Sequence, residues 1–305
     1  MTFPIITVSP DSSTQLEQLG TKEKCWFQQG ESTMFLFKVG RPNTGENWAE
    51  KVCCEIARLL GLPHAEYDLA LWGGKQGVIT PSLVPDNGRL ILGNELLAWV
   101  YKTYDPAIRY KSTQHILRRV IAVLQQSTIN APTGWDCPPQ VLDAVGVFAG
   151  YLLLDALVCN QDRHHENWGL IVTPEYGLRL APTFDHASSL GRNETDENRR
   201  KRLNTKDNGF SIENYVAKAR SGFFENKSST KAMSTVDAFR ECAKANVSAS
   251  QYWLDRLFAI SESDFSDILG EIPDEFISSE ARKFANAMLS INRNRLLSLN
   301  GTRHT

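Results

Sequence analysis

Hydrophobic periodicity changes character once along this 305-residue chain, near Leu90. Before that point, strand-like segments bounded by glycine are frequent, which is the pattern of a sheet. After it, apolar residues recur every three or four positions over longer segments, which is the pattern of helices that bury one face. A chain with this order builds a small sheet first and a helical body second. We therefore expect an α+β fold with two lobes.

The expected elements follow from these periods. In the first part we expect strands at residues 24–29, 33–39, 67–71 and 76–80, and a helix at residues 48–60 that Gly61 ends. In the second part we expect helices at residues 93–101, 113–125, 141–158, 236–245, 251–259, 262–269 and 278–299, with a strand-rich patch at residues 169–185. Residues 1–88 are predicted to form a small β-rich N-lobe and residues 89–305 a large helical C-lobe, with a ligand cleft between them.

Composition narrows the class of protein. Hydrophobic residues make up 42% of the chain, charged residues make up 22%, and the formal net charge is −2, so nothing in the totals points to nucleic acid or a membrane surface. No apolar run is long enough to cross a bilayer, and the N-terminus lacks the pattern of a secretory signal. Six cysteines without CxxC spacing are expected to be buried free thiols. We expect a cytoplasmic protein, and export as an effector stays open.

The richest polar stretch follows the apolar segment that ends at Val158. It contains Asp162 and, five residues later, Asn167, and Asp185 follows the next strand-rich patch. Protein kinases use an Asp as the base for the substrate hydroxyl, an Asn five residues later and a further Asp downstream. The Asn and the downstream Asp hold the metal. Carboxylate and amide oxygens suit Mg²⁺. We therefore predict Asp162 as the catalytic base and Asn167 and Asp185 as Mg²⁺ ligands.

The first part of the chain offers the other groups that a kinase needs. Lys38 ends an apolar strand, the place of the lysine that holds the α- and β-phosphates of ATP. Glu50 lies near the start of the following helix, where a glutamate could orient that lysine. Glu55 is a competing partner, but its spacing from Glu50 places it on a different face of the helix. The alternative without a functional role is that Lys38 is an ordinary lysine at a strand end.

Several motifs resemble those of the HipA-like kinases. The segment Asn160-Gln-Asp-Arg-His-His-Glu-Asn167 resembles their catalytic loop, and Ala181-Pro-Thr-Phe-Asp185 resembles their metal-binding turn. The segment Gly20-Thr-Lys-Glu-Lys24 resembles the remnant of their phosphate loop. The likeness extends over nearly the whole chain from about Leu16. It implies a two-lobed, protein-kinase-like fold and a serine/threonine protein kinase that uses ATP and Mg²⁺.

The resemblance also implies a biological setting. It implies the toxin of a bacterial toxin–antitoxin system, which phosphorylates an aminoacyl-tRNA synthetase or another translation protein. The chain lacks the additional N-terminal subdomain of full-length HipA, as the short HipT type does, in which a small HipS-like protein supplies that part. The expected partners are therefore a protein substrate, an antitoxin and such a small protein, and neither a membrane nor directly bound nucleic acid.

The same resemblance assigns further site residues. It places His164 in the catalytic loop beside Asp162. The residues expected to bind the nucleotide are Gly20, Thr21, Lys22, Lys38, Glu50 and Thr80.

One position departs from the family. HipA-type toxins carry a self-phosphorylated serine three positions before the phosphate-loop glycine, and this chain has Glu17 there. A glutamate cannot be switched by phosphorylation. Control could pass to Ser12, Ser13 or Thr14 just upstream, or to a partner protein that covers the cleft.

Three other functions stay open. A lipid kinase of the phosphatidylinositol type shares the broader fold, although no basic amphipathic helix for a membrane surface stands out. A secreted effector kinase would carry the same motifs. A pseudokinase would bind ATP without turnover, although the complete set of Lys38, Asp162, Asn167 and Asp185 argues against it.

Two features have purely structural interpretations as well as functional ones. His164 could be a metal ligand, but no third soft ligand is spaced nearby, so a histidine that braces the loop is favoured. The basic run at residues 199–202 is expected in a solvated loop, and the alternative is an analogue of the activation loop that contacts the substrate.

Overall fold

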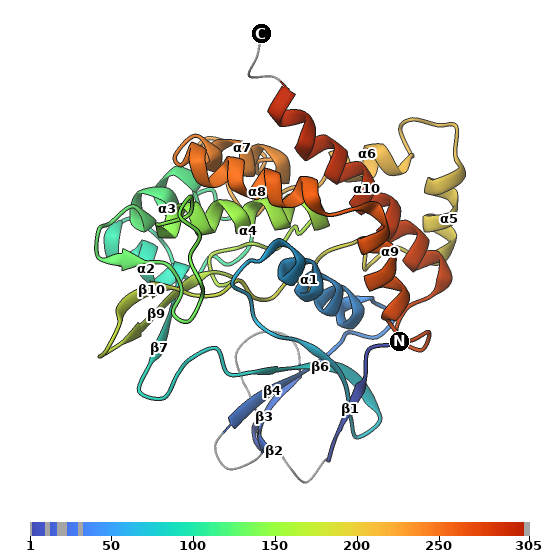
Figure 1. The fold of residues 1–305 in the computed structure, drawn as a ribbon, viewed down its shortest axis with the longest axis horizontal. Helices are drawn as coiled ribbons and strands as arrows, with labels where there is room; N and C mark the ends of the chain where they lie inside the picture. Colours follow the sequence, from blue (N-terminus) through green and yellow to red (C-terminus); the bar gives the residue numbers. More distant parts are fainter. Residues whose placement is uncertain (1, 10–12, 17–22, 30–32, 302–305) are drawn as a thin grey trace.

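The computed structural model describes residues 2–9, 13–16, 23–29 and 33–301, and it has a sheet-rich part and a helical part (Figure 1). The expected α+β class is confirmed. The N-terminal strands form a six-stranded sheet in the order β1-β5-β6-β4-β3-β2, with β1 parallel to β5 and the other neighbours antiparallel. These strands are β1 (Ile5–Val8), β2 (Ser13–Leu16), β3 (Lys24–Gln29), β4 (Thr33–Val39), β5 (Asp68–Trp72) and β6 (Lys75–Pro81).

The two faces of this sheet differ because successive side chains of a strand point to opposite sides. Cys25 pairs with Phe37 across β3 and β4, and both are fully buried in a small apolar cluster. Leu36 pairs with Thr80 across β4 and β6, so these two lie on the opposite face together with Lys38. The alternation therefore separates a core face from a face that presents Lys38 and Thr80.

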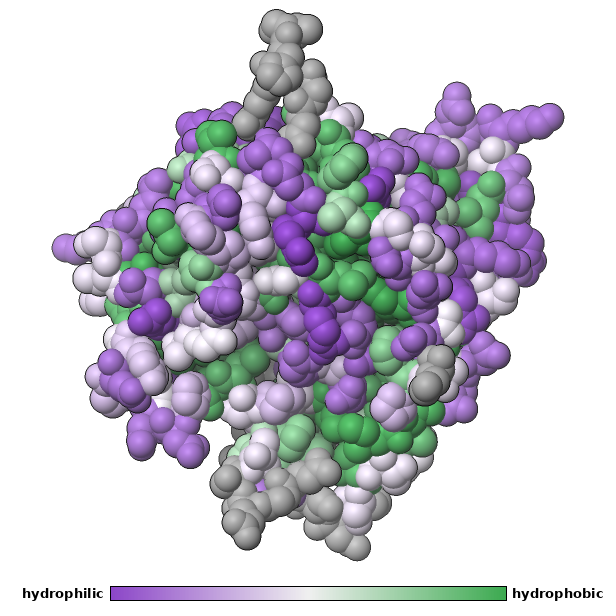
Figure 2. Space-filling model, in the orientation of Figure 1, coloured by the Kyte–Doolittle hydropathy of each residue, from purple (hydrophilic) through white to green (hydrophobic). Residues whose placement is uncertain are grey.

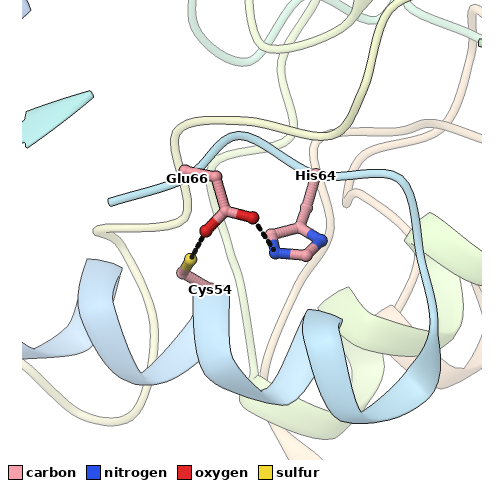
Figure 3. A group of neighbouring side chains, drawn as sticks. All are labelled: Cys54, His64 and Glu66. Atoms are coloured by element: carbon pink, nitrogen blue, oxygen red, sulfur yellow. Dashed lines mark hydrogen bonds and ion pairs between the residues drawn. The ribbon is translucent and has the colours of Figure 1, made fainter. Parts of the chain in front are cut away.

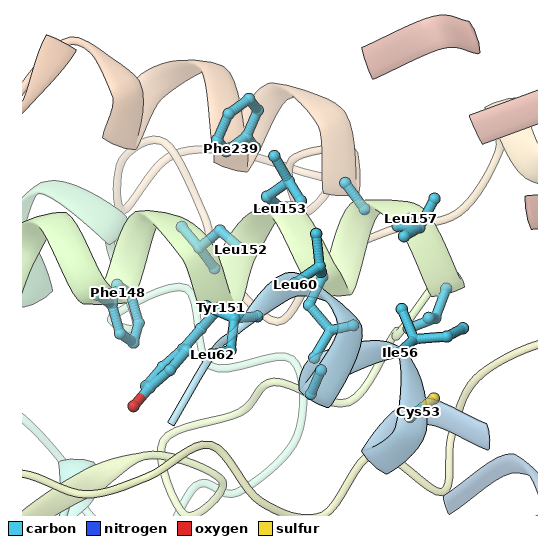
Figure 4. Packing of buried hydrophobic residues seen from close by; sticks show 14 of the residues in the cluster. Cys53, Ile56, Leu60, Leu62, Phe148, Tyr151, Leu152, Leu153, Leu157 and Phe239 are labelled. Carbon is cyan, nitrogen blue, oxygen red and sulfur yellow. The ribbon is translucent and has the colours of Figure 1, made fainter. Parts of the chain in front are cut away.

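Two helices form the junction between the sheet and the helical part. In α1 (Glu46–Leu60), Ile56 and Leu60 are buried, and they pack beside α4 (Ala144–Val158) in Figure 4. Every residue of α4 is buried, which explains why its sequence is apolar on all sides. Phe239 of α7 (Thr235–Ala243) covers another side of α4. The core therefore runs continuously from α1 through α4 into the helical part.

The ends of α4 fix the loop that follows it. Asp143 caps the first turn by accepting a hydrogen bond from Gly146 N. At the other end Cys159 has φ 54°, a left-handed conformation that stops the helix. Residues 160–168 leave α4 at this point, so the most buried helix of the protein positions the segment with the predicted base.

A second, four-stranded sheet has the order β7-β9-β10-β8, and its strands β9 and β10 follow this loop in the chain. Its strands are β7 (Arg89–Leu92), β8 (Ile129–Asn130), β9 (Gly169–Thr173) and β10 (Gly177–Leu180). The remaining helices are α2 (Gly93–Val100), α3 (Leu117–Leu124), α5 (Asp196–Asn204), α6 (Ile212–Ala217), α8 (Val247–Ala259), α9 (Glu262–Glu271) and α10 (Ser279–Gly301).

The surface is mixed in character. Apolar residues form separate patches among polar ones on the face shown in Figure 2. Within the described ranges, no helix combines the length and hydrophobicity that a bilayer crossing requires.

The interpretation of residues 199–202 as a solvated loop is wrong, because they lie in helix α5. Thr195 caps this helix, Asp196 and Glu197 lie in its first turn, and basic residues lie in its last turn, which suits the helix dipole. Arg199 is buried and donates to Asp196 Oδ1 at 2.8 Å and to Gly191 O at 3.1 Å. A run of charged residues shows no periodic pattern of apolar residues, so hydrophobic periodicity alone could not reveal this helix.

Two helices begin later than their periodicity predicts. The helix expected at residues 113–125 begins at Leu117, because Ile116 forms a β-bridge with Phe224. The helix expected at residues 141–158 begins at Ala144, because Asp143 takes the capping position. Local capping and a long-range bridge override the apolar pattern at these positions.

Candidate active site

The structure brings together residues from distant parts of the chain. Lys38 of β4 lies beside Asp185, with 3.4 Å between Nζ and Oδ1, although 147 residues separate them. Asn167 Nδ2 donates to Asp162 O at 2.7 Å within the loop that follows α4. Direct contacts therefore join the four residues proposed from sequence as the reacting set in two pairs, Lys38 with Asp185 and Asn167 with Asp162.

The side chain of Asp162 is accessible while its backbone is held. Asp162 N donates to Asn160 Oδ1 at 3.1 Å, and Asn160 Nδ2 donates to Asp155 Oδ1 at 2.8 Å. The Asp162 side chain is 32% exposed, and its Oδ2 accepts from Ser188 Oγ at 3.2 Å. A carboxylate in this position can reach a substrate hydroxyl from the solvent side.

A buried ion pair, which sequence analysis missed, clamps this loop. Arg163 donates to both carboxylate oxygens of Asp155, at 2.7 and 2.8 Å, and its side chain is 1% exposed. It also donates to Asn167 O at 2.8 Å and to Thr183 Oγ1 at 2.9 Å. One guanidinium thus joins α4, the loop and the turn that carries Asp185. The adjacent Asp-Arg dipeptide was the available signal, but nothing local identifies Asp155 as its partner.

His164 contacts the backbone of its own loop. Its Nδ1 accepts from Glu166 N at 3.1 Å, its Nε2 lies 3.3 Å from the donor Arg109 Nε, and the same Nε2 lies 3.7 Å from Asp162 Oδ1. Burial, followed by the nearby Arg109 guanidinium, lowers the pKa of His164 to about 3. This geometry is what a loop-bracing histidine requires.

No hydrogen bond or ion pair joins Lys38 and Glu50. Lys38 Nζ donates to Tyr67 OH at 3.1 Å, and Asp185 N donates to the same hydroxyl at 3.3 Å. Glu50 is 1% exposed and its Oε1 accepts from His186 N at 2.6 Å. The expectation of direct Glu50–Lys38 contact is therefore corrected: Glu50 holds the turn that carries Asp185, and Tyr67, which sequence analysis missed, holds Lys38.

The charge of Lys38 is maintained despite its burial. Burial by itself would lower the pKa of the amine, but the charge of Asp185, followed by Tyr67 and Glu50, raises it above its ordinary value. Lys38 is therefore a cation at neutral pH. It is only 8% exposed, so solvent screens its field weakly.

The turn before Asp185 has an unusual backbone. Asp185 has φ 60°, which is uncommon for a residue other than glycine. Thr183 N donates to Pro63 O at 3.0 Å, and Ala65 N donates to Thr183 O at 2.8 Å. The segment after α1 thus pairs with this turn and holds the Asp185 carboxylate beside Lys38.

A cavity of about 240 Å³ lies between the sheet and these loops. Lys38, Thr80, Asn167 and Asp185 are among its lining residues. Thr80, expected to bind nucleotide, is 6% exposed on this wall. Arg109, which sequence analysis missed, also lines it. Gly20, Thr21 and Lys22 lie outside the described residues.

A separate group of potential metal ligands lies at the end of α1. Ligand atoms of Cys54, His64 and Glu66 lie within 4.8 Å of one another (Figure 3). His64 Nε2 is 3.4 Å from Glu66 Oε1, and Cys54 Sγ is 3.7 Å from Glu66 Oε2. The Arg58 guanidinium also bonds Glu66, so a cation already faces this carboxylate. We interpret the group as a polar cluster that supports the segment paired with Thr183.

Comparisons with known proteins bear on the fold. No protein-family model matches the chain, and no curated protein matches it. The solved structure of the Helicobacter pylori proinflammatory kinase CtkA matches with a TM-score of 0.73 at 19% identity, covering 98% of each chain. The toxin–antitoxin complex of HipA, HipB and operator DNA from Shewanella oneidensis MR-1 matches with a TM-score of 0.53 at 12% identity, covering 93% of this chain and 67% of that one. The expected kinase-like fold is confirmed.

Three buried histidines predict acid sensitivity. Burial lowers the pKa of His115 and His164 to about 3 and that of His165 to about 4, so all three are neutral in the folded protein at pH 5. In the unfolded chain they become protonated below about pH 6.5. The unfolded state therefore binds more protons, and the free energy of unfolding should fall as the pH falls from about 6.5 to 4, by about 1.4 kcal/mol per pH unit for each histidine.

His115 offers the sharpest test of this prediction. Its Nδ1 donates to Gly222 O at 2.8 Å and its Nε2 accepts from Trp168 Nε1 at 3.1 Å, a pair of bonds that the amide of His115→Gln can imitate. Urea unfolding at several pH values should show one proton fewer taken up on unfolding of this variant. An unchanged pH slope would reject the assignment of a neutral buried His115.

Proposed function

We propose that this protein is an ATP-dependent serine/threonine protein kinase of the HipA type. The observation that carries the proposal is that Lys38, Asn167 and Asp185 line one cavity within a kinase-like fold, and that Asn167 is hydrogen-bonded to the backbone of Asp162. Asp162 accepts the proton of the substrate hydroxyl, Lys38 binds phosphate oxygens, and Asn167 and Asp185 bind Mg²⁺.

The residues present fit Mg²⁺ and ATP. Asp185 and Asn167 offer the hard oxygen ligands that Mg²⁺ prefers. Asn167 donates its amide nitrogen to Asp162 O, and its Oδ1 accepts no hydrogen bond from any described residue. When bound, ATP would supply the phosphoryl group, and Mg²⁺ would neutralise the negative charge of that group during transfer. The cationic Lys38 amine at the cavity wall suits phosphate binding.

The chain's own residues also position the base. Ser188 Oγ donates to Asp162 Oδ2, and Arg192 in turn donates to Ser188 Oγ at 3.1 Å. These contacts direct one carboxylate oxygen of Asp162 toward Ser188. Asn167 and Asn160 hold the backbone on either side, so the base keeps its orientation without a direct contact to Lys38.

The biological setting belongs to the same proposal. The match with the HipA toxin–antitoxin complex supports a bacterial toxin that phosphorylates an aminoacyl-tRNA synthetase or another translation protein, with an antitoxin and a small HipS-like partner. A secreted effector kinase is the second candidate, because a proinflammatory kinase matches over 98% of both chains. Expression inside bacteria separates the two, since only a translation toxin should stop growth in a way that Asp162→Ala abolishes.

A direct assay tests the activity itself. Purified protein is incubated with labelled ATP and Mg²⁺ and with serine, threonine and tyrosine peptides or phosphatidylinositol vesicles. Phosphate on serine or threonine supports the proposal, whereas transfer to the lipid alone identifies a lipid kinase. ATP binding without transfer to any acceptor, including bacterial lysate proteins, identifies a pseudokinase.

The metal assignment predicts a selective binding defect. Asp185→Asn should weaken binding of ATP with Mg²⁺ by at least ~10-fold, because a charged ligand of the metal is lost. Binding of ADP without metal should change much less. Calorimetry with both ligands measures this, with Asp136→Asn, an exposed carboxylate elsewhere, as the control. Equal losses for the two ligands would contradict a metal role for Asp185.

A further inference from the structure

A second and larger cavity, of about 620 Å³, opens on the other side of Asp162. Its floor includes Asp162 and His164 of the loop after α4. One wall is formed by residues 109–115 and the other by residues 220–232. The predicted base lines this cavity, and its backbone is hydrogen-bonded to Asn167, which lines the cavity that contains Lys38. An acceptor hydroxyl in this second cavity could therefore approach Asp162.

Backbone hydrogen bonds hold the two walls together. Phe224 N donates to His115 O at 3.0 Å and so joins the two walls, and Met233 N donates to Phe223 O at 2.8 Å and so closes the second wall on itself. At Gly222 an added Cβ would lie 2.3 Å from Arg163 O, so only glycine lets this wall contact the base-bearing loop so closely. The cavity is a built part of the fold rather than a gap between loose loops.

The charges around this cavity are strongly one-sided. Lys111, Arg220 and Lys231 line it, all three are exposed, and none has an ion pair with a described residue. Arg109 also lines it but pairs with Glu166 at 2.8 Å. Asp162 is the one carboxylate in the described lining.

This arrangement of cations favours a negatively charged ligand. Three unpaired cations on two walls repel a basic segment and attract an acidic one, and a concave surface concentrates their field. The lining also includes aromatic and hydroxyl side chains, such as Tyr110, Phe224 and Thr230, which suit a peptide. A nucleic-acid surface would need a longer basic stripe, and the chain as a whole has a net charge of −2.

We propose that this cavity binds an acidic segment of the protein substrate, with aspartates or glutamates flanking the serine or threonine that is phosphorylated. The part of this inference that identifies the bound segment as the phosphoryl acceptor rests on the proposed kinase function. The binding preference itself rests on Lys111, Arg220 and Lys231 alone.

Binding of a fluorescent peptide tests the preference without requiring turnover. The peptides carry a central serine flanked by acidic, neutral or basic residues, and binding is measured by anisotropy in a non-hydrolysable ATP analogue with Mg²⁺. The triple variant Lys111→Glu, Arg220→Glu, Lys231→Glu is compared with Lys102→Glu, Lys206→Glu, Lys218→Glu, which makes the same charge change at exposed positions outside the cavity. Thermal unfolding confirms that both variants fold.

The expected result is preferential binding of the acidic peptide by the wild type and the control triple. The cavity triple should bind it about 10-fold more weakly or worse, because three attractions become repulsions. The preference should weaken as salt is added. Equal binding by both triples, or equal binding of acidic and basic peptides, would overturn the inference.

Two further measurements separate this inference from its alternatives. An RNA oligomer of equal charge that binds more tightly than the peptide and is lost in the cavity triple would replace the peptide by nucleic acid. Acidic-peptide binding that depends on the cavity, in a wild type that transfers no phosphate, would reject the kinase proposal and retain the binding site. If transfer is active, kcat/KM for the acidic peptide should fall in the cavity triple while ATP binding stays unchanged.

Discussion

Replacing Asp162 by alanine is expected to lower the rate of phosphotransfer by about 10²–10⁴-fold and to leave ATP binding intact. The carboxylate is the proposed proton acceptor, and no other side chain of the loop takes its place. Its hydrogen bond with Ser188 lies near the surface, so its loss should cost little stability. Single-turnover transfer and calorimetry with Mg·ATP measure the two effects separately.

Asp136→Ala is the control for this experiment, because it removes an exposed carboxylate far from the cavity lining. Asp162→Asn adds a second comparison, since it keeps the shape and the Ser188 contact but cannot accept the proton. Near-normal turnover by either Asp162 variant would show that another group is the base.

Replacing Arg163 by alanine is expected to lower the free energy of unfolding by about 3–5 kcal/mol, because it leaves the Asp155 carboxylate buried without a cation. The side chain is 1% exposed and donates to Asp155, Asn167 and Thr183, so no water can take over these bonds without opening the structure. Urea unfolding measures the change. Phosphotransfer should fall as well, since the same guanidinium joins the two segments that carry Asp162 and Asp185.

Arg240→Ala provides the matched comparison. Arg240 pairs with Asp237 at 2.7 Å, but both side chains are about half exposed, so its loss should cost at most ~1 kcal/mol. Replacing both buried partners, as in Asp155→Leu with Arg163→Met, should recover part of the lost stability. A cost for Arg163→Ala no larger than that for Arg240→Ala would show that the buried pair does not clamp the loop.

The sequence was informative where chemistry requires fixed residue types at short spacing. Asp162 and Asn167 lie five residues apart in one loop, so their relation could be seen without knowing the fold. Lys38 on a strand before a helix could be identified in the same way, and the structure places it 3.4 Å from Asp185. Whether these residues perform the proposed steps stays a prediction for the experiments above.

The sequence was less informative where a residue's partner is distant. Tyr67 accepts a hydrogen bond from Lys38, and Arg109 lines both cavities, yet neither residue belongs to a motif. Glu50 was expected to contact Lys38, but a local pattern cannot say which neighbour a buried carboxylate will reach. In the structure it bonds the backbone of His186.

The sequence by itself determined the order of a sheet-rich part and a helical part, and the local spacing of the candidate catalytic residues. Both are readable because periodicity and loop motifs depend on residues close together in the chain. Only the tertiary structure decided that Asp155 clamps Arg163, that Tyr67 replaces Glu50 beside Lys38, and that two walls of cations flank Asp162. Burial sets these contacts, because a polar group removed from water must bond whichever partner the packed chain brings within reach.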